Sequence, residues 1–263
     1  MPVDADLVEG RLADREVPWP RPHVTESTGS TNADLLDLAR AGAPEGSVVV
    51  ADEQTAGRGR LGRAWVSAPA AGLWFSVLLR MPPDRDRGLL PLLAGLAVSE
   101  AARRHGVPAA LKWPNDVVID GAALDGSPGP RKLAGVLSET DGEDAVVIGI
   151  GVNLTQTAGQ LPIPAATSML LEGSVVARDD LLIDTLTVLH SLVSDLRREG
   201  GGFVMDAYRD RCLTVGRDVT VTLPNGEELS GRAIGVGDDG QLHVRTPEKT
   251  VSVAAGDVIH ATI

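Results

Sequence analysis

The sequence is poor in cysteine and aromatic residues, and it contains no evident secretory or membrane-spanning segment. Cys212 is the single cysteine among 263 residues, so no internal disulfide can form and a disulfide-stapled secreted domain is excluded. Aromatic residues make up 3% of the chain, which leaves Leu, Val and Ala to fill the core. The most apolar run, residues 89–102, is too short to cross a bilayer, and residues 1–22 lack the apolar segment of a signal peptide. We therefore expect a cytoplasmic protein with no membrane partner.

Net positive charge and several familiar catalytic motifs are also absent. The formal net charge is −12, whereas nucleic-acid binding needs a broad basic surface that displaces counterions, so we expect no nucleic-acid partner. The five histidines lack the spacing of a zinc site. There is no GxxxxGK[ST] loop and no GxSxG elbow. A P-loop nucleotide enzyme, a zinc enzyme and a hydrolase with a GxSxG serine are therefore disfavoured.

One basic segment contrasts with this acidic background. Residues 57–63 (GRGRLGR), here called the arginine loop, place three arginines and three glycines within seven residues. Glycine lets the backbone approach a ligand closely, and each guanidinium group offers a planar fork of donors to phosphate or carboxylate. The loop therefore indicates an anion-binding site. Taken alone, it fits equally well a solvated basic turn or part of an RNA-binding RGG segment.

The patterning of apolar residues divides the chain into three parts. Residues 1–22 are acidic and interrupted by proline, and we expect a weakly structured leader. Residues 23–213 are expected to form the main domain, and 214–263, with short strands and hairpin-type Asn-Gly and Asp-Gly dipeptides, a small SH3-like barrel. We expect a hydroxyl-rich turn over 25–32, then a helix with Leu35, Leu38 and Ala39 on one face. Further strands are expected over 47–51, 72–80, 109–113, 117–119, 131–139, 145–153, 219–223, 229–236, 241–245 and 251–253, and helices over 88–105, 179–198 and 203–213.

Polar clusters lie at or beside the ends of several expected strands. Lys132 falls in an apolar strand, where an unpaired ammonium is costly; a ligand anion would remove that cost, and an edge-strand lysine that reaches solvent would do so equally well. Asn115 and Asp116 offer oxygen ligands suited to Mg²⁺, although Pro-Asn-Asp also favours a plain turn. Ser30 and its neighbours either cap the helix that follows or bind a ligand at its N-terminus, and the two roles are compatible.

Five of these segments, taken in order, closely resemble the motifs of biotin–protein ligases. They are residues 29–32 (GSTN), 54–65 (QTAGRGRLGRAW), 112–116 (KWPND), 132–135 (KLAG) and 149–153 (GIGVN). Each motif is weak alone, but the ordered set is specific, and it covers roughly residues 25–160. The resemblance implies an α+β fold in which a mixed sheet carries helices packed on one side, related to class II aminoacyl-tRNA synthetase domains, followed by an SH3-like barrel.

The resemblance also implies a two-step reaction that requires ATP and Mg²⁺. Biotin and MgATP would give biotinyl-5′-AMP and pyrophosphate, and a lysine of a biotin carboxyl carrier domain, as in acetyl-CoA carboxylase, would then accept biotin and release AMP. Because only a short segment precedes the matching region, we expect no DNA-binding domain and no repressor function. A lipoate–protein ligase and a non-catalytic binder of biotin or adenylate remain alternatives, and the oligomeric state, with a homodimer among the options, stays open.

Individual residues receive roles from the same resemblance. Lys132 and Arg60 are expected to neutralise charge during catalysis, and Asp116 to accept or orient the proton of the acceptor lysine. Asn115 and Asp116 are the candidate Mg²⁺ ligands. Biotin contacts are implied for Ser30, Thr31, Asn32, Gln54, Arg58, Gly59, Arg60, Lys132, Gly135 and Gly151, and ATP or adenylate contacts for Arg58, Arg60, Arg63, Trp65, Asn115, Lys132 and Asn153. The connection between Asp116 and Lys132 is longer than is usual in the family.

Overall fold

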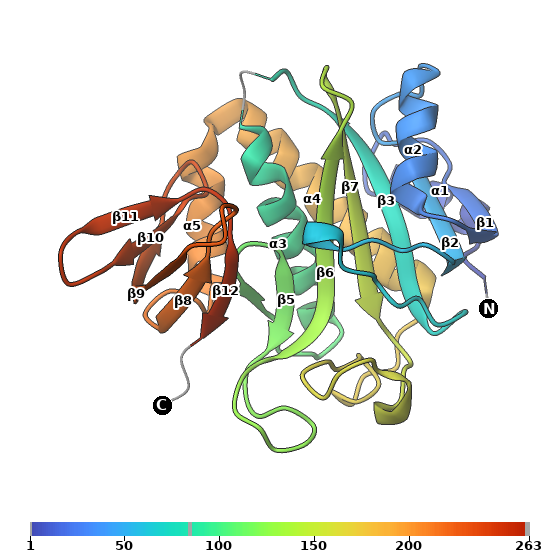
Figure 1. The fold of residues 1–263 in the computed structure, drawn as a ribbon. Helices are drawn as coiled ribbons and strands as arrows, with labels where there is room; N and C mark the ends of the chain where they lie inside the picture. Colours follow the sequence, from blue (N-terminus) through green and yellow to red (C-terminus); the bar gives the residue numbers. More distant parts are fainter. Residues whose placement is uncertain (1, 84–85, 261–263) are drawn as a thin grey trace.

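The computed structural model describes residues 2–83 and 86–260, which form two β-sheets with helices packed against them (Figure 1). None of the helices in these ranges is long and apolar enough to cross a membrane. The elements in chain order are α1 (Ala5–Ala13), β1 (His23–Thr28), α2 (Thr31–Arg40), β2 (Val48–Gln54), η1 (Arg60–Gly62), β3 (Gly72–Arg80), η2 (Arg87–Leu89), α3 (Leu90–Arg104), β4 (Ala110–Lys112), β5 (Asp116–Ile119), β6 (Arg131–Thr140), β7 (Ala145–Asn153), η3 (Ala158–Gln160), α4 (Arg178–Glu199), α5 (Gly201–Arg211), β8 (Asp218–Thr222), β9 (Glu228–Val236), β10 (Leu242–Arg245), β11 (Thr250–Val253) and β12 (Asp257–His260).

The main sheet has seven strands in the order β1-β2-β3-β7-β6-β5-β4. β1 pairs with β2 in parallel, and the other neighbouring strands pair antiparallel, so the expected mixed sheet is present. The central strands β3 and β7 are buried along nearly their whole length because protein covers both faces there. β6 and β7 therefore form a rigid central platform.

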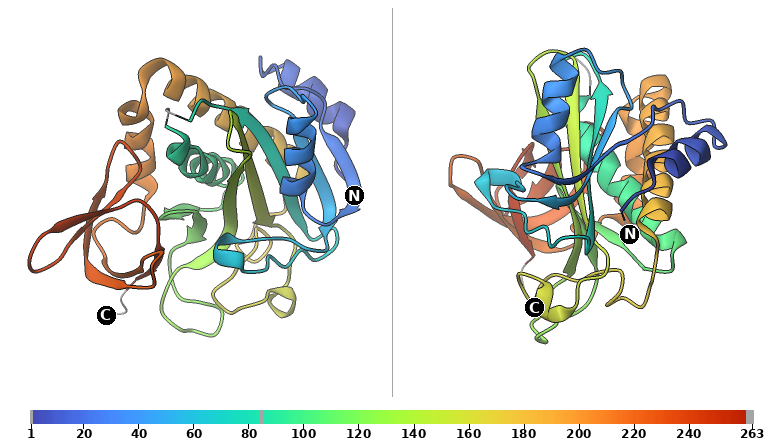
Figure 2. Two further views of the ribbon diagram at one scale, coloured as in Figure 1. Left: turned by 45° about the horizontal axis from the view of Figure 1, so that its top comes forward. Right: turned by 90° about the vertical axis from the view of Figure 1, so that its right-hand side faces the viewer.

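Successive side chains of a strand point to opposite faces, and here each face packs against different helices. Val48 and Val50 pack into the large core that includes residues of α3 and α4. Val49 packs on the other face, beneath Leu35 and Ala39 of α2. Figure 2 shows α2 and the arginine loop on one side of the sheet and α1, α3 and α4 on the other. The prediction that all helices pack on one side of the sheet is therefore wrong for α2. This helix covers part of the opposite face of the sheet.

The N-terminal residues also differ from expectation, because part of the presumed leader is a packed helix. The Asp4 side chain caps α1 by accepting hydrogen bonds from two backbone N–H groups, and Val8 and Leu12 are fully buried one helical turn apart. Arg15 forms an ion pair of 2.6 Å with Asp184 of α4. Burial of this i, i+4 apolar pair stabilises the helix. The acidic composition and the prolines of residues 1–22 had instead suggested a segment with little structure.

The second sheet has five antiparallel strands in the order β11-β10-β9-β8-β12, consistent with the expected SH3-like barrel. The four expected strands are present, and β12, which pairs with β8, was missed. Trp113, at the end of β4, joins this sheet to the main domain. Its indole N–H donates to Gly240 O at 3.0 Å, and its backbone N–H donates to Thr214 Oγ1 at 3.1 Å. These bonds fix the second sheet beside the β4 edge.

His260 makes this junction sensitive to acid. Its Nε2 lies 3.1 Å from Thr214 Oγ1. Burial, helped by the charges of Lys112 and Arg217 and opposed by Asp120, lowers the pKa of His260 from 6.5 to about 4. The unfolded chain thus binds this proton at a higher pH than the folded chain, so the stability contributed by the neutral ring is present above pH 6.5 and is lost as the pH falls towards 4.

We therefore expect His260→Gln to flatten the dependence of unfolding free energy on pH between 6.5 and 4. Urea denaturation at several pH values measures this slope. A variant that loses stability with acid as steeply as the wild type would contradict the assignment.

Candidate active site

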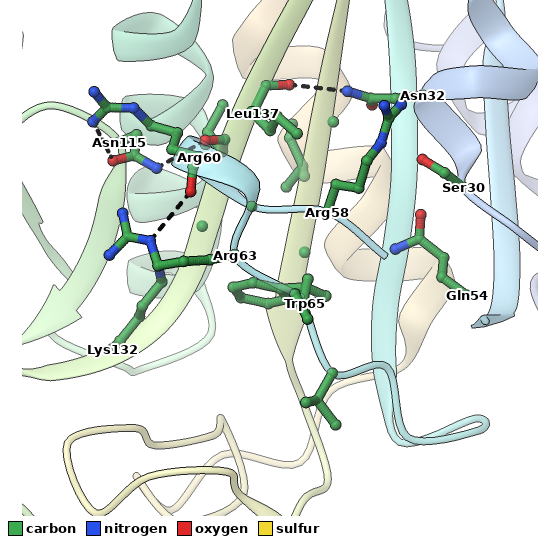
Figure 3. A pocket seen from close by; sticks show the side chains of 18 of the residues that line it. Ser30, Asn32, Gln54, Arg58, Arg60, Arg63, Trp65, Asn115, Lys132 and Leu137 are labelled. Atoms are coloured by element: carbon green, nitrogen blue, oxygen red, sulfur yellow. Dashed lines mark hydrogen bonds between the residues drawn. The ribbon is translucent and has the colours of Figure 1, made fainter. Parts of the chain in front are cut away.

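A cavity of about 480 Å³ opens on the α2 side of the main sheet (Figure 3). β6 and β7 form its floor, the N-terminus of α2 one wall, and the arginine loop its cover. Of the residues expected to form the site, all except Asp116 line the cavity: Ser30, Thr31, Asn32, Gln54, Arg58, Gly59, Arg60, Arg63, Trp65, Asn115, Lys132, Gly135, Gly151 and Asn153. Segments far apart in the sequence thus meet at one place.

Two glycines on the cavity floor make room for Trp65. Gly135 of β6 pairs with Gly151 of β7, so the two lie side by side. A Cβ atom at Gly151 would lie 2.6 Å from the Trp65 indole, and one at Gly135 would lie 2.9 Å from it. The indole N–H is buried and, within the described residues, has no hydrogen-bond partner. The glycines therefore admit the indole itself.

The wall at the start of α2 presents hydroxyl and amide groups. The backbone N–H and the hydroxyl of Thr31 both donate to Gln54 Oε1, at 3.0 and 3.1 Å. Buried Ser76 lies 2.7 Å from Thr31 Oγ1, which holds that hydroxyl in place. Ser30 is the N-cap residue of α2, but its side chain makes no capping hydrogen bond. Its hydroxyl and the positive end of the helix therefore suit a polar ligand group.

The three asparagines of the site have amide groups bonded to other parts of the protein. These hydrogen bonds fix the shape of the cavity. The amide of Asn32 donates to Leu137 O and Glu139 Oε2, that of Asn115 donates to Val136 O and accepts from Arg60, and that of Asn153 donates to Thr167 O and accepts from Gln156.

Lysine and arginine side chains gather at the opposite end of the cavity. Lys132 Nζ donates to Asp116 Oδ1 at 2.6 Å and lies 5.3 Å from the centre of the Trp65 ring. Lys112 is nearby, and burial lowers its pKa while the charge of Asp116 opposes that shift. Asp116 therefore holds Lys132 in place and does not itself line the cavity.

Each arginine of the arginine loop has a polar partner on another element, and Arg60 and Arg63 share Asp257. Arg58 pairs with Glu139 at 3.1 Å, and Arg60 donates to Asn115 Oδ1 at 3.1 Å. Arg60 is partly buried, and this burial lowers its pKa. Arg63 pairs with Asp257 of β12 at 2.9 Å, so the loop also touches the second sheet. No sequence motif marks Asp257 as part of this arrangement.

A further segment of the cavity wall was missed from the sequence. Pro162, Ile163 and Ala166 line the cavity from the connection between β7 and α4. This connection runs beside Lys132, whose N–H donates to Ala165 O at 2.7 Å. The prolines marked a loop, but nothing in the sequence shows that the loop folds back beside β6.

The candidate Mg²⁺ ligands do not form a metal site by themselves. Asn115 Oδ1 accepts from Arg60, and Asp116 Oδ1 is occupied by Lys132, so both oxygens face cationic groups. The described part of the chain also contains no cluster of three His, Cys, Asp or Glu residues suited to a metal ion. The donor set therefore does not fit a resident magnesium.

Two family models match the chain. Residues 24–153 match the biotin/lipoate A/B protein ligase family, and residues 214–261 match the biotin protein ligase C-terminal domain. The first match contains the motifs around the cavity, and the second coincides with the five-stranded sheet.

Relatives agree with these matches along nearly the whole chain. A biotin–[acetyl-CoA-carboxylase] ligase of Mycobacterium tuberculosis is 39% identical over 98% of this chain and 96% of its own length. One of the same name from Paracoccus denitrificans is 31% identical over 88% of this chain and 97% of its own. A solved biotin protein ligase from Aquifex aeolicus, in complex with biotin and ATP, superposes with a TM-score of 0.77 at 27% identity, covering 91% of this chain and 99% of its own.

Proposed function

The chain belongs to the biotin/lipoate A/B protein ligase family, and we propose that it is a biotin–protein ligase that joins biotin to a carboxylase through biotinyl-5′-AMP. The observation that carries the proposal is the cavity itself. It combines hydroxyl and amide groups at one end, an indole seated over two paired glycines in the middle, and cations at the other end. The relatives named as biotin–[acetyl-CoA-carboxylase] ligases support the choice of biotin over lipoate.

We place the fused rings of biotin at the end of the cavity beside Ser30, Thr31 and Gln54. The hydroxyl of Ser30 and the amide of Gln54 suit a ureido group, which both donates and accepts hydrogen bonds. The carboxylate then points towards Lys132 and Arg60, where the α-phosphate of ATP would also lie. This orientation brings the two reacting anions together among cations.

In the first step a carboxylate oxygen of biotin attacks the α-phosphorus of ATP, an O–P bond forms, and the bond to pyrophosphate breaks. Because both reactants are anionic, the protein contributes mainly charge neutralisation and alignment. Lys132 and Arg60 supply these cations, because the N–H groups that they do not donate to Asp116 and Asn115 can donate to phosphate oxygens. Magnesium would enter with the phosphates of ATP.

In the second step a neutral lysine amine of the acceptor attacks the carbonyl carbon of the adenylate, and AMP leaves. The arginine loop covers the cavity and limits access of water, which would otherwise hydrolyse the mixed anhydride. Since Asp116 is paired with Lys132, we assign it to orientation of that lysine.

We infer that the acceptor is a carboxyl carrier domain, and that residues 23–213 hold the chemistry while 214–263 support the arginine loop. Arg63 and Arg60 reach this second part at Asp257 and Gly256, which supports a shared role of the two parts in closing the cavity. The bonds of Trp113 to Thr214 and Gly240 keep the two parts aligned.

Pyrophosphate exchange tests the proposal. We expect the protein to exchange labelled pyrophosphate into ATP only when biotin is present, because the exchange requires reversible formation of the adenylate. Lipoate supplied in place of biotin should give no exchange above background. Exchange stimulated by lipoate alone would identify a lipoate ligase, and no exchange with either acid would indicate a binder without catalysis.

A further inference from the structure

Glu139 is a carboxylate beside the cavity that no motif marks as functional. It lies on β6, two residues beyond the lining residue Leu137, so both side chains point to the cavity side of the sheet. Its Oε2 accepts from Asn32 Nδ2 at 2.7 Å and from Arg58 Nη2 at 3.1 Å. One carboxylate oxygen therefore joins the wall of the cavity to its cover.

The Asn32 side of this contact is rigid. Asn32 is buried, and its Oδ1 lies 2.6 Å from the hydroxyl of buried Ser76. Its amide also donates to Leu137 O, and Gly149 beneath it leaves no room for a Cβ atom beside that amide. Glu139 is thereby held from below by a group that cannot easily move.

The Arg58 side of the contact belongs to the arginine loop, where the backbone of Arg58 also forms an isolated bridge with Ala64. Arg58 is 48% exposed, whereas Glu139 is 25% exposed, so the pair is partly shielded from solvent. Arg58 and Asn32 line the cavity, but Glu139 does not. A ligand that fills the cavity would therefore not displace the Glu139 carboxylate, which lies behind Arg58 and Asn32. The carboxylate can keep its contact with Arg58 while the ligand is bound.

We propose that Glu139 is a positioning residue, which tethers the first arm of the arginine loop over the biotin end of the cavity through Arg58. This inference rests on the proposed function for the identity of the ligand. It predicts that the charge on Glu139 strengthens biotin binding, although the carboxylate touches no substrate. The ATP end of the cavity, formed around Lys132 and Arg60, should be affected little.

Glu139→Gln tests the tether because glutamine keeps an oxygen that can accept from Asn32 but removes the charge opposite Arg58. We expect the dissociation constant for biotin, measured by calorimetry, to rise about tenfold, with the KM for ATP changed less than twofold. Trypsin should also cut the ligand-free chain faster at residues 58–63. Asp144→Asn is the matched control, because Asp144, in the turn between β6 and β7, forms a similar 2.7 Å pair with Arg80 of β3, and neither residue lines the cavity.

A double-mutant cycle makes the test specific to the pair. In an Arg58→Ala background, Glu139→Gln should weaken biotin binding by less than twofold. Three results would each overturn the tether. The effects of the two substitutions on biotin binding could be fully additive, Glu139→Gln could bind biotin as tightly as the wild type or more tightly, or trypsin could cut the variant and the wild type at equal rates. Wild-type protein that binds no biotin would overturn the proposed function, and the tryptic comparison, which needs no ligand, would still decide whether the tether exists.

Discussion

Lys132→Ala should reduce biotin-dependent pyrophosphate exchange by about 10²–10³-fold, because it removes a cation placed where charge develops during adenylate formation. Lys132 Nζ lies beside the Trp65 ring and is held by Asp116 at 2.6 Å. An ammonium fixed by a partner needs little reorganisation when the substrates arrive. Steady-state exchange at saturating ATP and biotin measures the loss.

The fold should tolerate this substitution. Asp116 loses its hydrogen-bond partner, but it remains close to Lys112 and Arg60. Its negative charge acts to raise the pKa of both residues, so it still interacts favourably with two cations. The melting temperature should therefore change little, and Lys249→Ala, in the exposed turn between β10 and β11, serves as the control for removal of a lysine. Near-normal exchange by Lys132→Ala would remove this residue from its proposed role.

Regular elements with strong local patterns could be predicted closely from the sequence. The expected strands over 72–80 and 145–153 coincide with β3 and β7, because uninterrupted apolar runs of this length suit the centre of a covered sheet. The helix over residues 179–198 likewise corresponds to α4. These elements are buried along most of their length, and their apolar residues indicate this burial directly in the sequence.

Elements that depend on distant partners were predicted less well. β1 is rich in hydroxyl groups and was expected to be a turn, but pairing with β2 makes it a strand. In α2, Leu38 is 41% exposed while Leu36 is buried, because the helix packs on the sheet along a different face than its spacing suggested. β12 was missed since its short run is completed only by pairing with β8.

The site shows the same division. Its motif residues could be predicted because their order along the chain matches a known pattern, and the structure brings all but Asp116 to the cavity lining. Glu139 and Asp257 could not be predicted, because nothing in the sequence around a strand carboxylate shows which arginine it will contact. The pairs with Arg58 and Arg63 form only in the folded chain. The partners of the arginine loop are a property of the folded chain.

Gly151→Ala is expected to weaken biotin binding by roughly 10–100-fold, which corresponds to the ~1–3 kcal/mol that overpacking costs. The added Cβ atom would lie 2.6 Å from the Trp65 indole. β7 cannot give way because it is paired with β3 on one side and β6 on the other. The indole must therefore move towards the space that the ligand would occupy. Calorimetric titration with biotin measures the change.

Two further variants separate this mechanism from general damage to the sheet. Gly235→Ala, at a strand glycine of β9 with nothing within 4 Å of the added atom, should bind biotin normally. Trp65→Phe removes part of the ring that the new Cβ atom meets, so the double variant with Gly151→Ala should bind biotin more tightly than Gly151→Ala alone. If the smaller ring restored nothing, the loss would have to come from displacement of β7 itself, and the role assigned to the paired glycines, which is to seat the indole, would be wrong.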